Sequence, residues 1–207
     1  MSRQRSIVVA AILGAALPAH ADHVQSPLGF TVWGDRGYPD RDATIAGLDL
    51  GLFDSFHREA DGVQIAVGFN IDGEQAGLQL AGLGNWTSNH ARGSVQLAGL
   101  FNVVDKADLV FQIAGGLNAA GSGRVVQLGT FNLTIDDSYG VQLGLFNVAI
   151  GNHTGVQIGG FNGATHVTGV QIGLYNFAKT LEGVQLGVIN IARNNAAPFT
   201  VLLNIGW

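Results

Sequence analysis

The sequence predicts an all-β fold in which tandem repeats of 14 to 17 residues form a β-solenoid. A unit that begins Gly-Val-Gln recurs in register at residues 140–147, 155–162, 169–176 and 183–190. Within each unit the side chains alternate with a period of two, which is typical of strands and not of helices. Polar links of similar length separate the units, as stacked coils require.

The repeat extends back through most of the chain in a less regular form. Its Gln position recurs at Asp49, Gln64, Gln79, Gln96, Gln112, Gln127, Gln142, Gln157, Gln171 and Gln185. The paired Asn position is predicted at Asp54, Asn70, Asn85, Asn102, Asn118, Asn132, Asn147, Asn162, Asn176 and Asn190, with a degenerate last unit at Asn204.

Stacked coils place equivalent residues about 4.8 Å apart, so each repeat position becomes a column. We expect the apolar positions to form internal columns, namely Val141, Val156, Val170, Val184 and Leu143, Ile158, Ile172, Leu186. Side-chain amides can bond along such a stack as ladders. The predicted ladder residues are Gln127, Gln142, Gln157, Gln171, Gln185 and Asn132, Asn147, Asn162, Asn176, Asn190.

An outer-membrane β-barrel of about 12 strands, with one strand per repeat, is the alternative architecture. Its support is the C-terminal segment, which resembles the terminal strand signal of outer-membrane barrels because it alternates and ends on an aromatic residue: Phe199, Val201, Leu203, Ile205, Trp207. Three Tyr and three Trp are too few for two aromatic girdles, and the period is one unit where barrels favour two. The solenoid is therefore favoured.

The N-terminus has the features of a secretory signal peptide over residues 1–21. Arg3 and Arg5 precede an apolar run at residues 6–17, and Ala19-His20-Ala21 fits a cleavage site. Residues 22–43 are expected to cap the array, with a short strand at Phe30–Gly34, and residues 44–207 to form the repeat domain. This organisation predicts export to the outer membrane or cell surface, with the periplasm left open.

Composition narrows the function classes. The 207 residues include 31 Gly and no Cys, and the formal net charge is -5. The lack of Cys excludes disulfides and thiolate metal sites, and the mild acidity argues against a nucleic-acid partner. After the N-terminal run, Gly, Gln and Asn interrupt every apolar stretch that could span a membrane as a helix.

No catalytic, cofactor-binding or metal-binding motif is present. The His residues fall in links or in the N-terminal segment, and we expect them to be solvated, with His57, Glu59 and Asp61 forming a charged turn. The prediction is a protein without enzymatic activity and without a cofactor. It would have a structural, adhesive or binding role, through a regular face of Gln, Asn and aromatic side chains whose ligand is open. A channel or transport role would follow from the barrel alternative.

The unit Gly-Val-Gln-Leu-Gly-x-x-Asn-x-Ala at residues 140–149 resembles the tandem surface repeat of exported bacterial proteins first named in Leptospira. The resemblance covers about residues 46–192 and implies an exported, envelope-associated protein of unknown biochemical role. An outer-membrane or cell-surface component is the partner that we expect for such a protein. It carries over no catalytic residue. The unit is also similar to the curlin repeat of amyloid fibres, but its period is shorter and the second Gln of curlin units is missing.

Overall fold

A computed structural model describes residues 25–34 and 36–207, so the predicted signal peptide lies outside the described residues. Within those ranges the chain forms strands and no helix. The strands are β1 Gln25–Trp33, β2 Arg36–Tyr38, β3 Thr44–Gly51, β4 Asp54–Ala66, β5 Phe69–Ala81, β6 Gly84–Ala98, β7 Phe101–Ala114, β8 Leu117–Leu128, β9 Phe131–Thr134, β10 Ser138–Ala192 and β11 Phe199–Gly206.

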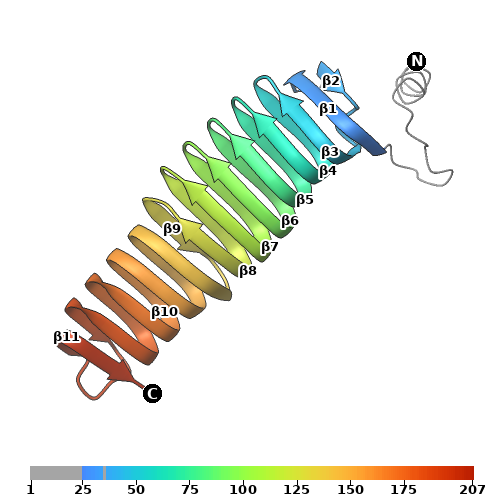
Figure 1. Ribbon diagram of the computed structural model, residues 1–207. Coiled ribbons are helices and arrows are strands. Elements are labelled where there is room, and N and C mark those ends of the chain that lie inside the picture. Colours follow the sequence, from blue (N-terminus) through green and yellow to red (C-terminus); the bar gives the residue numbers. More distant parts are fainter. Residues whose placement is uncertain (1–24, 35) are drawn as a thin grey trace.

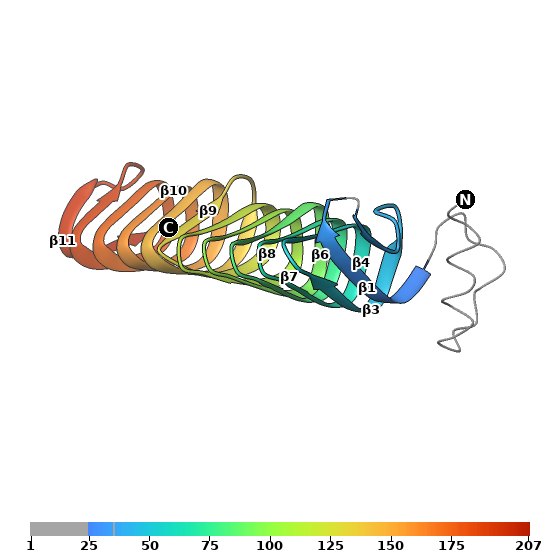
Figure 2. The same ribbon diagram turned by 90° about the horizontal axis from the view of Figure 1, so that it is seen from above.

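The coils stack into a rod, and the predicted β-solenoid is confirmed (Figures 1 and 2). From β3 to β10 each strand pairs in parallel with its neighbours in chain order. The register places Gln142 opposite Gln127 and Asn147 opposite Asn132, as the repeat predicts. The described coils form an open stack with two ends, so the barrel alternative is wrong.

In the regular C-terminal coils, one Gly at the start of each unit permits the close approach of neighbouring coils. Gly140, Gly155, Gly169 and Gly183 all have φ between 141° and 146°, a conformation that favours glycine. A Cβ at Gly155 would also collide with the carbonyl oxygen of Gly140. The Gly that begins these four units therefore has a backbone role, whereas Ser94, Val110 and Val125 occupy the same position in three earlier coils.

Different strands cover the two ends of the rod. β1 adds in parallel to β3, and β2 adds to β1 as an antiparallel edge. The predicted N-terminal strand is present but begins earlier, at Gln25. At the other end β11 reverses direction and pairs antiparallel with the last coil. Asn204 consequently faces Gln185, so the prediction of a last parallel unit with Asn204 at an Asn position is wrong.

The first coil also differs from its prediction by one residue. Register places Ser55 opposite Asn70, whereas Asp54 lies opposite Phe69. The reason is an extra residue between the Gln and Asn positions, since six residues separate Asp49 from Ser55 as they separate Gln64 from Asn70. Asp54 instead lies at the corner, where its carboxylate accepts a hydrogen bond from the Gly34 backbone N–H at 2.9 Å.

Candidate binding surface

The Gln position lies inside the coils and forms a continuous ladder. From Gln79 to Gln185, each Nε2 donates to the Oε1 of the Gln one coil earlier at 2.6–2.9 Å. These side chains are completely buried. A primary amide is both donor and acceptor, so identical neighbours satisfy one another without water.

The Asn position forms a second internal ladder, which runs in the opposite direction. From Asn70 to Asn176, each Nδ2 donates to the Oδ1 of the Asn one coil later at 2.8–3.0 Å. In most coils the same Nδ2 also donates to the carbonyl of the Leu or Ile that follows the next Gln, as Asn147 does to Ile158 at 2.9 Å. Each coil contains a strand that carries the Gln, which we call the Gln strand, and a strand that carries the Asn, which we call the Asn strand. The ladder satisfies backbone carbonyls beside the corner at which the Gln strand turns into the Asn strand.

Burial of the amides reverses the expected orientation of the apolar columns. Ile158, Ile172 and Leu186 point outward with 38–42% of their surface exposed, and the Val141 column beside them is only partly covered. The prediction that these Val, Leu and Ile residues line the interior is therefore wrong. The physical reason is space and pairing: the coil is narrow, and Gln and Asn fill it with bonded amides while small residues such as Ala149 and Ala178 fill the rest.

The outward Gln-strand positions are apolar in all ten coils. One column precedes the Gln position and the other follows it: Leu48, Val63, Leu78, Val95, Phe111, Val126, Val141, Val156, Val170, Val184 and Leu50, Ile65, Leu80, Leu97, Ile113, Leu128, Leu143, Ile158, Ile172, Leu186. A monomer in water rarely carries a contiguous apolar patch of this extent, and such patches mark binding surfaces.

An aromatic column continues this surface around the corner. Phe131, Phe146, Phe161 and Tyr175 each precede an internal Asn, and neighbouring ring centroids lie 4.7–6.1 Å apart. Phe131 and Phe146 are nearly parallel, at 6°. Aromatic side chains are therefore exposed as predicted for the binding face, but the Gln and Asn side chains of that predicted face are inside.

Between residues 62 and 192, charged residues fall only in the links that join the end of one Asn strand to the next Gln strand. All 11 Lys, Arg, Asp and Glu between residues 62 and 192 fall in the links, which we call the charged edge: residues 72–76, 88–93, 105–109, 121–124, 136–139, 151–154, 166–168 and 179–182. The segments between these links carry no charge and run from the Gln strand around the corner to the Asn strand. We call their outward side chains the apolar wedge: residues 62–71, 77–87, 94–104, 110–120, 125–135, 140–150, 155–165, 169–178 and 183–192.

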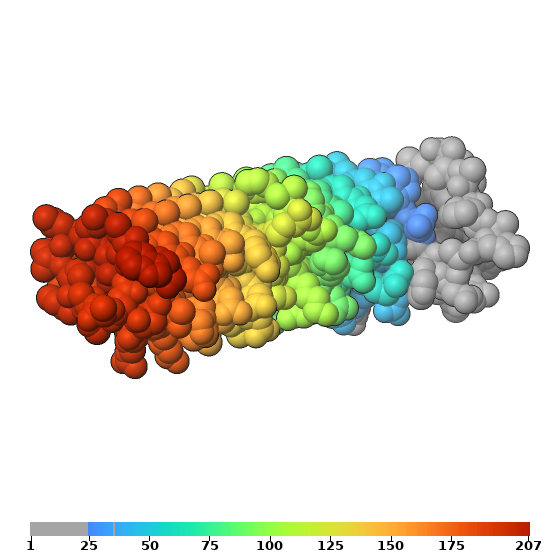
Figure 3. Space-filling model, turned by 90° about the horizontal axis from the view of Figure 1, so that it is seen from below, coloured from blue at the N-terminus to red at the C-terminus, as the bar shows by residue number. Residues whose placement is uncertain are grey.

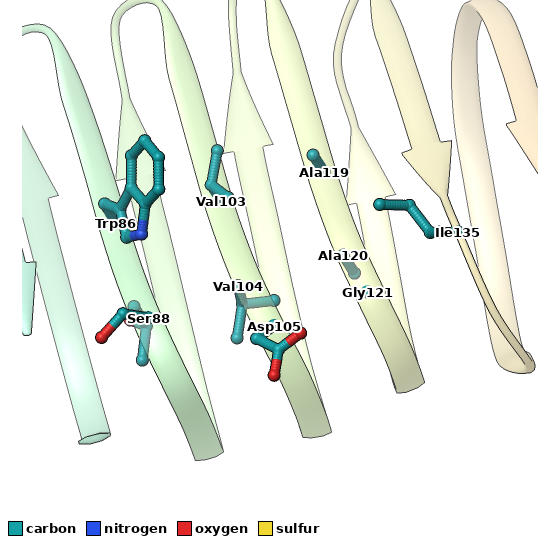
Figure 4. A pocket seen from close by; sticks show the side chains of 10 residues that line it. Trp86, Ser88, Val103, Val104, Asp105, Ala119, Ala120, Gly121 and Ile135 are labelled. Carbon is teal, nitrogen blue, oxygen red and sulfur yellow. The ribbon is translucent and has the colours of Figure 1, made fainter. Parts of the chain in front are cut away.

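Two shallow hollows interrupt the apolar wedge. One, of about 310 Å³, lies where Trp86 and Val103 on one side and Ile135 on the other flank the small residues Ala119 and Ala120 (Figure 4). The other, of about 500 Å³, lies on the Gln strands beside Ile65, Leu97 and Ile113. The chain advances in order along the rod surface (Figure 3).

In the N-terminal coils a buried polar cluster takes the place of the first members of the Gln and Asn ladders. Asp49 Oδ2 accepts from Ser55 Oγ and from His57 Nε2, the latter at 3.0 Å. Gln64 Nε2 donates to Ser55 at 3.2 Å and to Asp72 at 3.0 Å. His57 was predicted to lie in a solvated turn, and this is wrong: it lies in β4 with its side chain inside.

Burial governs the acidity of these interior groups. It raises the pKa of Asp72 well above the ordinary 3.8, and the nearby charge of Asp49 acts in the same direction. For Asp49 burial has the same effect, but hydrogen bonds from His57 and Ser55 outweigh it and lower the pKa. Burial also lowers the pKa of His153, a second His that was predicted to be solvated and is instead inside.

The cluster does not have the geometry of a nucleophilic triad. Ser55 and His57 both bond to the same oxygen of Asp49, whereas a triad needs the His between the nucleophile and the carboxylate. All three side chains are buried, so no substrate reaches them. Within residues 25–34 and 36–207, no group of three or more His, Asp or Glu could hold a metal ion.

The predicted C-terminal signal forms β11, Phe199–Gly206, and ends one residue after it at Trp207. Phe199, Val201, Leu203, Ile205 and Trp207 are all exposed, with Asn204 and Gly206 buried between them. Among the described residues, no helix is long and apolar enough to cross a membrane. No family model, no curated protein and no solved structure matches this chain.

Proposed function

We propose that this protein is a non-catalytic structural or binding component of the bacterial envelope, and that the apolar wedge is its binding surface. The observation that carries the proposal is the inverted distribution of side chains. Amides are inside and twenty large apolar residues are outside on the Gln strands alone. Water would have to cover this area in a free protein, so a partner that buries it gains free energy roughly in proportion to the area.

The N-terminal features support the cellular setting. Arg3, Arg5 and the apolar run at residues 6–17 fit a secretory signal, and the repeat resembles that of exported surface proteins. Repeat arrays generally provide extended surfaces rather than enclosed reaction sites. The buried Ser55, His57 and Asp49 supply no accessible nucleophile, so no reaction is proposed. The channel role followed from the barrel and is not proposed.

Fractionation of cells that express the full chain tests this function. The wild-type protein is expected in the envelope fraction, and Ile158→Lys/Ile172→Lys on the wedge is expected to release it as a soluble exported protein. The matched control is Thr154→Lys/Thr168→Lys, which adds the same charge to the charged edge of the same coils. A wild-type protein that stays in the cytoplasm would contradict the proposal, as would a wedge variant that is retained as well as the control.

A further inference from the structure

We propose that the apolar wedge inserts into one leaflet of a lipid bilayer, with the rod axis parallel to the membrane plane. This inference rests on the proposed function, since it names the partner of the same surface. The wedge is convex: its apolar residues occupy the Gln strand, the corner and the start of the Asn strand of each coil. Lipid closes around a convex edge on both flanks, whereas a second rod packed against one flank leaves the other exposed.

The corner carries several strongly exposed apolar side chains of the wedge. Leu100, Leu145 and Leu174 hold equivalent corner positions two residues before the internal Asn, and 51–63% of their surface is exposed. Val67 and Val188 at the same corner are exposed to 67% and 55%. These side chains would be the deepest in the leaflet, and they lie furthest from the links that carry the charges.

The backbone at this corner is already satisfied without water, which hydrocarbon requires. Leu100 N–H donates to the Leu83 carbonyl at 2.9 Å, and Gly116 N–H donates to the Leu100 carbonyl at 3.1 Å. Phe146 N–H donates to the Thr130 carbonyl at 2.9 Å in the same way. The Asn ladder bonds the carbonyls just before the corner, as Asn176 does for Leu186 at 3.0 Å. Turns that face water usually leave such groups to the solvent.

The depth of the wedge suits insertion into an interface and not a span. About five residues lie on each flank of the corner before the links begin, as at residues 140–144 and 146–150, which is roughly 16 Å of strand. This is about half of the hydrocarbon core of a bilayer, which is roughly 30 Å thick, so the wedge matches the depth of one leaflet. Trp86 and Tyr175 lie on the Asn-strand side of the wedge, and such side chains favour the boundary between headgroups and acyl chains.

The distribution of charge indicates that the acyl chains of the lipid, and not the charge of its headgroup, attract the wedge. The wedge itself has none, and the charged edge carries both signs, so anionic headgroups have no basic patch to attract. Binding is therefore driven by apolar area. It is expected on zwitterionic phosphatidylcholine, with little change between low and high salt, and detergent rather than salt should reverse it.

Vesicle flotation with the purified protein tests the inference. Wild type is expected to float with phosphatidylcholine vesicles, and Leu100→Glu/Leu145→Glu/Leu174→Glu to partition at least about 100-fold less. The control Asn89→Glu/Thr154→Glu/His166→Glu adds three acids on the charged edge and should float like wild type. All six substituted positions are on the surface, so we expect both variants to fold like wild type. Circular dichroism and the melting temperature of each protein check this.

Three outcomes would overturn the inference. Wild type that stays at the bottom of the gradient as a dimer by light scattering would mean that a second copy covers the wedge. Flotation of the corner variant equal to that of wild type would mean that lipid binds elsewhere. If the protein fails to float yet remains envelope-bound in cells and is released by Ile158→Lys/Ile172→Lys, the lipid partner is wrong and the proposed function stands.

Discussion

The two ends of the rod use the same coil with different interiors. In the C-terminal coils, from residue 140 onward, each internal Gln and Asn meets a copy of itself, and Ala fills the next inward position. In the N-terminal coils the equivalent positions carry Asp49, Ser55, His57 and Asp72, which bond across columns. A carboxylate only accepts hydrogen bonds, so Asp49 cannot continue a ladder and ends it. The ladders of the regular end thus satisfy themselves, whereas the irregular end holds the buried carboxylates Asp49 and Asp72.

The largest effect is expected from breaking a ladder in the regular coils. Asn147→Leu removes the bonds to Asn162 Oδ1 and the Ile158 carbonyl and the bond received from Asn132, and it leaves buried groups unpaired. We expect the free energy of unfolding to fall by about 3–5 kcal/mol, since each buried unpaired group costs about 1–3 kcal/mol. Urea unfolding measures this, and a loss below about 1 kcal/mol would mean that the ladder adds little.

The next effect concerns the buried carboxylate of the irregular end. Because the pKa of Asp72 is raised on folding, its contribution to stability is complete below pH 3.8 and is lost as the pH rises through the folded value. Asp72→Thr copies the next coil, where Thr87 Oγ1 accepts from Gln96 at 3.0 Å. The variant should be more stable than wild type at neutral pH by roughly 1–3 kcal/mol.

Thermal unfolding from pH 4 to pH 8 measures the effect of Asp72→Thr. The stabilisation should grow as the pH rises and vanish in acid. Equal stability of the two proteins across the whole range would show that Asp72 is ionised at no cost.

A smaller effect of opposite sign is expected within the regular coils at His153. Its pKa is lowered by burial, so its contribution is present above pH 6.5 and is lost as the pH falls below that value. Leu181 occupies the equivalent position 28 residues later, two repeat steps along. The free energy of unfolding of wild type should therefore fall between pH 6.5 and pH 5 by about 1 kcal/mol more than that of His153→Leu. An unchanged pH profile of the melting temperature would contradict the assignment.

The smallest effect is expected at the charged edge, where the ion pair of Arg92 and Glu74 at 3.0 Å is about half exposed. Exposed pairs contribute little because water screens them and the side chains lose freedom. Arg92→Ala should change the free energy of unfolding by less than about 0.5 kcal/mol. A loss as large as that of Asn147→Leu would show that the charged edge, and not the ladder, holds the coils together.

The sequence predicted the all-β class and the register of the regular coils, because the unit recurs in order and its side chains alternate with a period of two. It identified which residues share a column, as for Gln142 with Gln127. It did not show which side of the strand faces inward, since alternation is the same for either side. Hydrophobicity favoured Leu143 inside, but the narrow coil selects amides that pair with their own copies.

The remaining errors lie where the repeat loses its regularity. At the first coil an extra corner residue moved the Asn position from Asp54 to Ser55, and at the last the chain reversed before Asn204. One available signal was the constant six-residue separation of Gln and Asn in the early units, which already predicts Ser55. Asn194, Asn195 and Pro198 are turn-forming residues that mark a break before β11, but they do not show whether the next strand continues or reverses.

The inverted interior is tested most directly by thiol accessibility, because the chain contains no Cys. Gln157→Cys and Ile158→Cys place thiols on adjacent residues of one strand, one on each side. A maleimide should label Cys at position 158 of the folded protein rapidly and Cys at position 157 slowly, and both should react alike in denaturant. Rapid labelling at 157 with protection at 158 would mean that the aliphatic columns line the core and that the amides face the solvent.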